Sequence, residues 1–206
     1  PNEWNQSERP MILQLMKMGW KYQKGDTGVP ELSEREDFKQ VLLKDRLREA
    51  IKRINGNDGP VDDVMADRVI MDLENAAGTG SIIERNKRVT EKLLNGSYQK
   101  PADGSVQSRL FRYIALDPDK IGENDFLAMN QFKVQPPGGR SAIIPDLVLF
   151  VNGIPLVVVE CKSPSVADPL EEAINQLLRY SNQRSWIEDQ EGAEQLFLYN
   201  QLMVAT

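Results

Sequence analysis

The sequence predicts an α/β fold, in which a mixed sheet of four or more strands is flanked by helices and additional N-terminal helices pack around it. Two observations carry this prediction. Apolar residues recur at helical spacing through most of residues 1–100, whereas after Pro101 short strand-like runs alternate with Gly, Pro and Asp turns. We therefore expect one domain over 1–206, with a mainly helical elaboration over 1–100 and the α/β core over 101–206.

Four helices are predicted in the first hundred residues. Gly19 ends the first of them, because glycine readily adopts the conformation that caps a helix C-terminus. Ser33 and Glu36 form a capping-box pattern that would begin the second. The predicted helices cover residues 7–18, 33–54, 61–77 and 81–95.

Strand-like runs dominate the second half of the chain. Asp168 and Pro169 interrupt them, and these residue types suit the N-cap and the first turn of a helix, which we expect to run to about Trp186. A further element begins near Leu202. The predicted strands cover residues 109–116, 125–135, 143–151, 154–162 and 196–199.

The composition excludes several kinds of catalytic site. The chain has no histidine, which excludes Ser-His-Asp and Cys-His catalysis and histidine-bound zinc. Cys161 is the single cysteine, so a disulfide within the chain and a cysteine-built zinc site are excluded as well. A catalytic metal would have to sit on oxygen ligands, which favours Mg²⁺, Mn²⁺ or Ca²⁺.

The net charge of −6 is not typical of a nucleic-acid-binding protein. Residues 101–206 hold 8 Lys and Arg against 14 Asp and Glu. Since cations that contact phosphates supply most non-specific affinity for DNA, we expect the chain alone to bind DNA weakly. If it acts on DNA, a partner or a neighbouring domain would have to deliver the substrate.

Charged residues stand at the end of an apolar strand. Residues 154–159 are almost continuously apolar, which indicates a strand covered on both faces. Glu160 and Lys162 follow directly, and strand alternation places both on one face with Cys161 on the other. A Glu-x-Lys alone would be an ordinary surface ion pair, but charges at a buried strand end are costly unless they are paired or bound to a metal.

Asp146 can join these residues only if the hairpin register allows it. Asn152 and Gly153 predict the turn between the two strands. A plain two-residue turn would pair Asp146 with Val159 and turn it away from Glu160. We therefore predict a three-residue loop, or a bulge with the same effect, that makes Asp146 and Glu160 diagonal neighbours on one face, roughly 7–8 Å apart at Cα.

These residue types suit metal-assisted hydrolysis of a phosphodiester. Asp146 and Glu160 would hold a divalent cation, and the carbonyl of Cys161 could supply a further oxygen. The cation would polarise the phosphodiester and lower the pKa of a bound water. Lys162 would orient or help deprotonate that water and offset negative charge that develops on the phosphate.

Three further polar residues are candidates for the same site. Gln176 and Tyr180 lie four residues apart on the predicted helix and so share a face, from which they could reach a phosphate or groups around the metal. A Gln/Tyr pair at this spacing is, however, usually packing with satisfied polar tips. Glu8 is another candidate acid for this site. It could equally well be an exposed residue in the first turn of a helix.

The order of these residues resembles a known superfamily. Pro145-Asp146 followed by Glu160-Cys161-Lys162 resembles the PD-(D/E)xK nucleases, and Gln176 to Tyr180 resembles the QxxxY motif of some members. The chain is more closely similar to the N-terminal nuclease domain of the R (restriction) subunit of type I restriction-modification enzymes. The segments that match are Asn124-Asp-Phe, Asn130-Gln-Phe, the run from Pro145 to Pro164, and the run from Glu172 to Tyr180.

The resemblance implies a restriction-endonuclease-like core and Mg²⁺-dependent cleavage of double-stranded DNA. It implies metal-ligand acids at Asp146 and Glu160, a catalytic lysine at Lys162, and QxxxY residues at Gln176 and Tyr180. In this family, ATP-driven helicase-like domains move the DNA, while partner subunits recognise and methylate it. The chain has no G-x-x-x-x-G-K-[ST] loop, so ATP would act only through domains outside it, and we expect the chain to be a fragment of a longer polypeptide.

Two alternatives remain open from the sequence. One is a stand-alone or repair nuclease of the same superfamily, which the substrate preference of the intact protein would separate. The other is a non-catalytic docking module for a restriction complex, which would have no need of Mg²⁺ or Mn²⁺. The chain lacks an apolar run of the ~20 residues that a membrane span needs, and residues 1–20 lack a signal-peptide pattern, so we expect a cytoplasmic protein.

Overall fold

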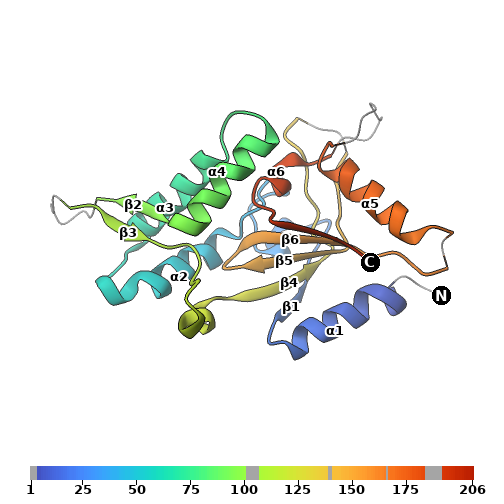
Figure 1. Cartoon of the computed structure of the whole chain (residues 1–206), viewed down its shortest axis with the longest axis horizontal. Helices are drawn as coiled ribbons and strands as arrows, with labels where there is room; N and C mark the ends of the chain where they lie inside the picture. The colour runs from blue at the N-terminus through green and yellow to red at the C-terminus, as the bar shows by residue number, and fades with distance from the viewer. Residues whose placement is uncertain (1–3, 101–106, 139–140, 166, 184–191) are drawn as a thin grey trace.

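The computed structural model describes residues 4–100, 107–138, 141–165, 167–183 and 192–206. Helices, short helical turns (η) and strands alternate along the chain (Figure 1). The helical elements are η1 (Trp4–Glu8), α1 (Arg9–Lys17), η2 (Pro30–Ser33), α2 (Lys44–Asn55), η3 (Gly56–Asp58), α3 (Asp63–Ala76), α4 (Ile82–Asn95), η4 (Pro118–Glu123), α5 (Pro169–Tyr180) and α6 (Glu194–Phe197). The strands are β1 (Lys21–Lys24), β2 (Ser97–Gln99), β3 (Arg109–Phe111), β4 (Phe126–Asn130), β5 (Leu147–Val151), β6 (Ile154–Glu160) and β7 (Leu202–Ala205).

A five-stranded mixed sheet forms the centre of the molecule, in the order β1-β4-β5-β6-β7. The middle strand β5 runs antiparallel to both of its neighbours, β4 and β6, and the edge strands β1 and β7 each run parallel to their neighbour. The predicted fold class, a mixed sheet flanked by helices, is confirmed. β1 comes from the first hundred residues, so that part of the chain is not purely helical and contributes an edge of the sheet.

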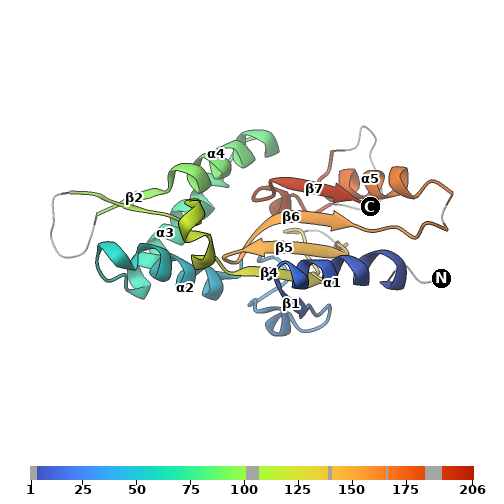
Figure 2. The same ribbon diagram turned by 60° about the horizontal axis from the view of Figure 1, so that its bottom comes forward.

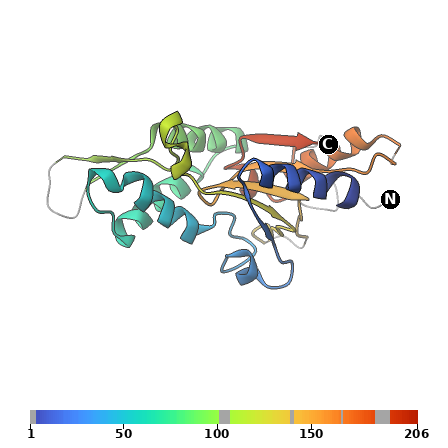
Figure 3. The ribbon, with the colours of Figure 1, turned by 90° about the horizontal axis from the view of Figure 1, so that it is seen from below.

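Helices cover both faces of this sheet. Helix α1 lies across one face, where Ile12 and Leu15 pack on Ala128, Leu147 and Val159 (Figure 3). A larger apolar cluster lies on the other face and includes residues of α5 and α6. Successive side chains of a strand point to opposite faces, so the two clusters tell us which face each strand residue occupies.

Helices α2, α3 and α4 form an arm that extends from one end of the sheet, together with the hairpin of β2 and β3 (Figure 2). The helices predicted near 61–77 and 81–95 are confirmed as α3 and α4. Asp62 caps α3 by accepting a hydrogen bond from Met65 N–H, and Ser81 and Glu84 form a capping box on α4. Within the described residues, none of the helices is both long enough and apolar enough to span a membrane.

Two predicted elements are wrong. The helix expected to begin at Ser33 begins at Lys44, because the Ser33 hydroxyl bonds Asp26 and the backbone of Leu43 bonds Gly153. Residues 194–197 form helix α6, and the strand expected at 196–199 is absent. The side-chain amide of Asn86 binds three carbonyls there, those of Phe197, Leu198 and Asn200.

The helix expected from Pro169 to about Trp186 is α5, which ends at Tyr180. The last residues of that expectation fall within 184–191 and lie outside the described residues. The element expected from Leu202 is the edge strand β7.

Candidate active site

A bulge in the β5–β6 hairpin decides where Asp146 lies. The turn has two residues, Asn152 and Gly153, both with positive φ (55° and 80°), which fits a type I′ turn. From the turn, Val151 pairs with Ile154, but further along Leu147 pairs with Val159. One residue of β6 is therefore extra, and the pairs on either side of it identify it as Leu156.

This register places Asp146 opposite Glu160. Asp146 precedes β5 directly, so the pairing of Leu147 with Val159 continues to Asp146 and Glu160. The three-residue loop predicted from the sequence is wrong. The alternative prediction, a bulge in the hairpin, is correct. The two acids share a face, as expected, but they face one another directly rather than diagonally.

Glu160 is a fully buried carboxylate. Its Oε1 accepts a hydrogen bond from the ammonium of Lys162 at 2.9 Å, while its Oε2 is buried without a hydrogen-bond partner in the described part of the chain. Burial raises the pKa of Glu160 to about 8, and the negative charge of Asp146 adds to this rise, against the opposing effect of Lys162. A buried acid with one unsatisfied oxygen is costly unless a proton or a cation compensates it.

The carboxylate of Asp146 is held by the strand that carries Glu160. Its Oδ2 accepts a hydrogen bond from the backbone N–H of Cys161 at 2.7 Å. The side chain of Cys161 is buried in the apolar cluster on the α1 face, with Ile12 and Leu15. Cys161 thus behaves as a small core residue whose backbone, rather than its thiol, faces the two acids.

Helix α5 brings Gln176 and Tyr180 to the same place. The helix packs through a buried stripe that includes Ala173, Leu177 and Tyr180. The amide of Gln176 donates a hydrogen bond to the Tyr180 hydroxyl, which in turn donates a long one of 3.4 Å to the carbonyl of Ile144. Burial raises the pKa of Tyr180 and the charge of Glu160 raises it further, so this ring lies within the field of the acid pair.

Glu8 is buried, so its reading as an exposed first-turn residue is wrong. It ends the π-helical turn η1 and accepts a hydrogen bond from the Asn130 amide at 2.7 Å. Asn130 in turn accepts one from the Tyr22 hydroxyl at 2.9 Å. Neither Asn130 nor Tyr22 was predicted from the sequence as a site residue. The one signal for Asn130 was that it is a polar residue at the end of the apolar strand β4.

The residues at the strand end fit a hard divalent cation with few protein ligands. Among the described residues no group of three or more His, Cys, Asp and Glu side chains comes together, so Asp146 and Glu160 would have to hold the ion with the help of carbonyl and water oxygens. Mg²⁺ commonly binds in this way, through one or two carboxylates while it keeps several waters. The unpartnered Oε2 of Glu160 is the observation that favours a cation at this position.

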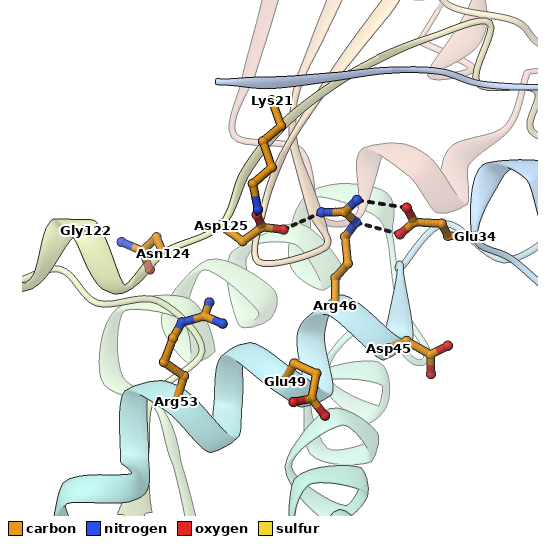
Figure 4. Close-up of a pocket in the computed structure, with 9 residues that line it drawn as sticks. All are labelled: Lys21, Glu34, Asp45, Arg46, Glu49, Arg53, Gly122, Asn124 and Asp125. Atoms are coloured by element: carbon orange, nitrogen blue, oxygen red, sulfur yellow. Dashed lines mark hydrogen bonds and ion pairs between the residues drawn. The ribbon is translucent and has the colours of Figure 1, made fainter. Parts of the chain in front are cut away.

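A hollow of about 550 Å³ lies elsewhere, between α2 and the start of β4 (Figure 4). Four of its charged side chains are paired with one another. Arg46 bonds both oxygens of Glu34 and one oxygen of Asp125, and Lys21 bonds the other oxygen of Asp125 at 2.6 Å. We call these four residues the Arg46 cluster, and none of them was predicted from the sequence as a functional residue.

Comparison with known proteins identifies relatives over nearly the whole chain. The family model described as "Type I restriction enzyme R protein N terminus" matches residues 2–206. A putative type I restriction enzyme MjaIXP endonuclease subunit of Methanocaldococcus jannaschii is 31% identical over 97% of the chain, as is the type I restriction enzyme HindI endonuclease subunit of Haemophilus influenzae. The chain spans 18% of the length of each of these two relatives.

Proposed function

Because the chain belongs to the family of type I restriction enzyme R protein N termini, we propose that it is the nuclease module of such a subunit and cleaves double-stranded DNA by Mg²⁺-dependent hydrolysis. The observation that carries this proposal is the pair of acids at the end of β6. Glu160 is fully buried with one unpartnered oxygen, Asp146 lies opposite it, and Lys162 bonds its other oxygen.

We assign the metal to Asp146, Glu160 and the carbonyl oxygen of Cys161. When bound there, Mg²⁺ (or Mn²⁺) would polarise a phosphodiester and lower the pKa of a bound water. The backbone N–H of Cys161 orients the Asp146 carboxylate by a 2.7 Å hydrogen bond to its Oδ2. Lys162 holds Glu160 from the other side and supplies a positive charge next to the position of the phosphate.

Gln176 and Tyr180 would act at the same phosphate or at the water. Each is anchored by the buried stripe of α5, and their mutual hydrogen bond fixes both polar tips near Glu160. A fixed amide and hydroxyl can orient a phosphate oxygen without rearranging during the reaction. Glu8 remains a candidate further acid, held in place by Asn130.

Other parts of the assembly would supply what this chain lacks. We propose that helicase-like domains of the same polypeptide bind ATP and move the DNA, and that specificity and methylation subunits recognise it. The net charge of −6 supports this division, since the chain has few cations to spare for phosphates. Cytoplasmic DNA would be the substrate.

Alanine variants of Asp146 and Lys162 test the proposal in the full-length protein. Asp146→Ala and Lys162→Ala should each lower the rate of DNA cleavage at least about 100-fold, because each removes charge stabilisation from the transition state. Glu91→Ala, which removes an exposed acid of α4, is the matched control and should cleave normally. Normal cleavage by the Asp146 or the Lys162 variant would refute the assignment.

A further inference from the structure

Lys162 lies beyond the regular part of its strand. β6 ends at Glu160, and the chain continues without regular secondary structure over 161–165. A lysine side chain has four rotatable bonds, so its ammonium is placed only as well as the backbone from which it starts. The Lys162 side chain is nevertheless largely buried and its Nζ lies 2.9 Å from Glu160. Something other than the strand must therefore fix the backbone of Lys162.

The two polar groups of the Lys162 backbone are bound by opposite ends of the chain. Its N–H donates to the carbonyl of Thr206, which extends the β6–β7 pairing, at 2.8 Å. Its carbonyl accepts a hydrogen bond from the hydroxyl of Ser7 at 2.8 Å, across 155 positions of sequence. The neighbouring Ser163 hydroxyl donates to Gln6 Oε1 at 3.1 Å.

Ser7 and Gln6 belong to η1, a single π-helical turn that precedes α1. Such turns are rare in proteins and frequently occur at functional sites. The turn does not depend on Ser7 for its attachment, because α1 is anchored to the sheet by Ile12 and Leu15. The Ser7 hydroxyl is therefore not needed to hold η1 against the sheet. The group that it contacts is the carbonyl of Lys162.

We infer that Ser7 is a positioning residue for Lys162: its hydroxyl fixes the Lys162 carbonyl and so sets the ammonium against Glu160 and the phosphate. This inference rests on the proposed function. Loss of the hydroxyl frees one side of the Lys162 peptide while Asp146 and Glu160 keep their contacts. A displacement of about 1 Å in a reacting group can cost about 100-fold in rate.

Ser7→Ala in the full-length protein tests the inference. Loss of such a supporting contact typically lowers activity about 10–100-fold, and we expect a fall of this size in kcat with KM for DNA unchanged. The affinity for Mn²⁺, measured by calorimetry, should stay within about twofold of wild type, since Ser7 does not contact the acid pair. Ser7→Thr keeps a hydroxyl and should restore most of the lost rate.

Ser33→Ala is the matched control, because Ser33 is a serine in a more buried position than the half-buried Ser7 and its hydroxyl likewise bonds backbone, in this case that of Asp26. It should leave kcat unchanged. Wild-type kcat in Ser7→Ala would overturn the inference, and so would a parallel loss of Mn²⁺ affinity and thermal stability, which is what a merely structural role predicts. Asp146→Ala separates the two claims: if that variant cuts normally the proposed function fails, whereas if it is inactive and Ser7→Ala is normal only the role of Ser7 fails.

Discussion

Two groups of charged side chains in this molecule are built from the same residue types but are balanced differently. In the Arg46 cluster, two acids meet two bases, and every carboxylate oxygen of Glu34 and Asp125 has a cationic partner. At the end of β6, the ammonium of Lys162 bonds one oxygen of Glu160, and the other oxygen of Glu160 is buried with no hydrogen-bond partner in the described chain.

The pKa values of the two groups move in opposite directions. Burial raises the pKa of Asp125, but hydrogen bonds from Lys21 and Arg46 lower it below its ordinary value overall. For Glu160, burial and the charge of Asp146 outweigh the single lysine and raise the pKa to about 8. The carboxylates of the Arg46 cluster are therefore fully paired, whereas within the described residues the buried carboxylate of Glu160 is paired at one oxygen only. A buried carboxylate whose charge is only partly compensated indicates a functional site rather than a contribution to stability.

Glu160→Gln should give the largest effect, because it removes the buried carboxylate whose pKa is raised. The unfolded chain releases the Glu160 proton near its ordinary pKa, whereas the folded protein keeps it up to about pH 8. Without metal, the free energy of unfolding of the wild type should therefore fall by roughly 3 kcal/mol more than that of Glu160→Gln between pH 5 and pH 8. Urea denaturation at a series of pH values measures this difference. Parallel stability curves for the two proteins would contradict the raised pKa of Glu160.

Asp125→Asn should have a smaller effect, and on stability alone. Asparagine keeps one acceptor but loses the ion pairs with Arg46 and Lys21, so the free energy of unfolding should fall by about 1–2 kcal/mol. The cleavage rate per folded molecule should not change. Asp45→Asn, at the far more exposed partner of Arg48, is the control and should change stability by less than about 0.5 kcal/mol. If Asp125→Asn lost cleavage while it kept full stability, the two groups would not differ in role as argued.

The sequence was sufficient to predict the acid pair but not its geometry. An apolar run that ends in Glu160 and Lys162 is a local signal, and it led to the correct strand and the correct face. The register depends on Leu156, the extra residue of the bulge, whose carbonyl binds the Gln201 N–H at 2.8 Å. A contact between such distant positions leaves no mark on the local pattern, so the loop length was predicted wrongly.

Long-range contacts also explain the other errors. Residues 196–199 are apolar enough for a strand, but the side chain of Asn86 binds the local carbonyls and stabilises a helical turn. The contacts of Glu8 with Asn130 and of Ser7 with Lys162 join the turn η1 to residues more than a hundred positions away in the sequence. Local periodicity predicts which residues form helices and strands, whereas the support around the site depends on how those elements meet.

Calorimetric titration with Mn²⁺ at pH 8 tests the central claim most directly, because it asks whether the acid pair binds a divalent cation. The wild-type protein should bind Mn²⁺, and the double variant Asp146→Asn, Glu160→Gln should not, while Glu91→Gln should bind as the wild type does. Failure of the wild type to bind, or undiminished binding by the double variant, would contradict the account.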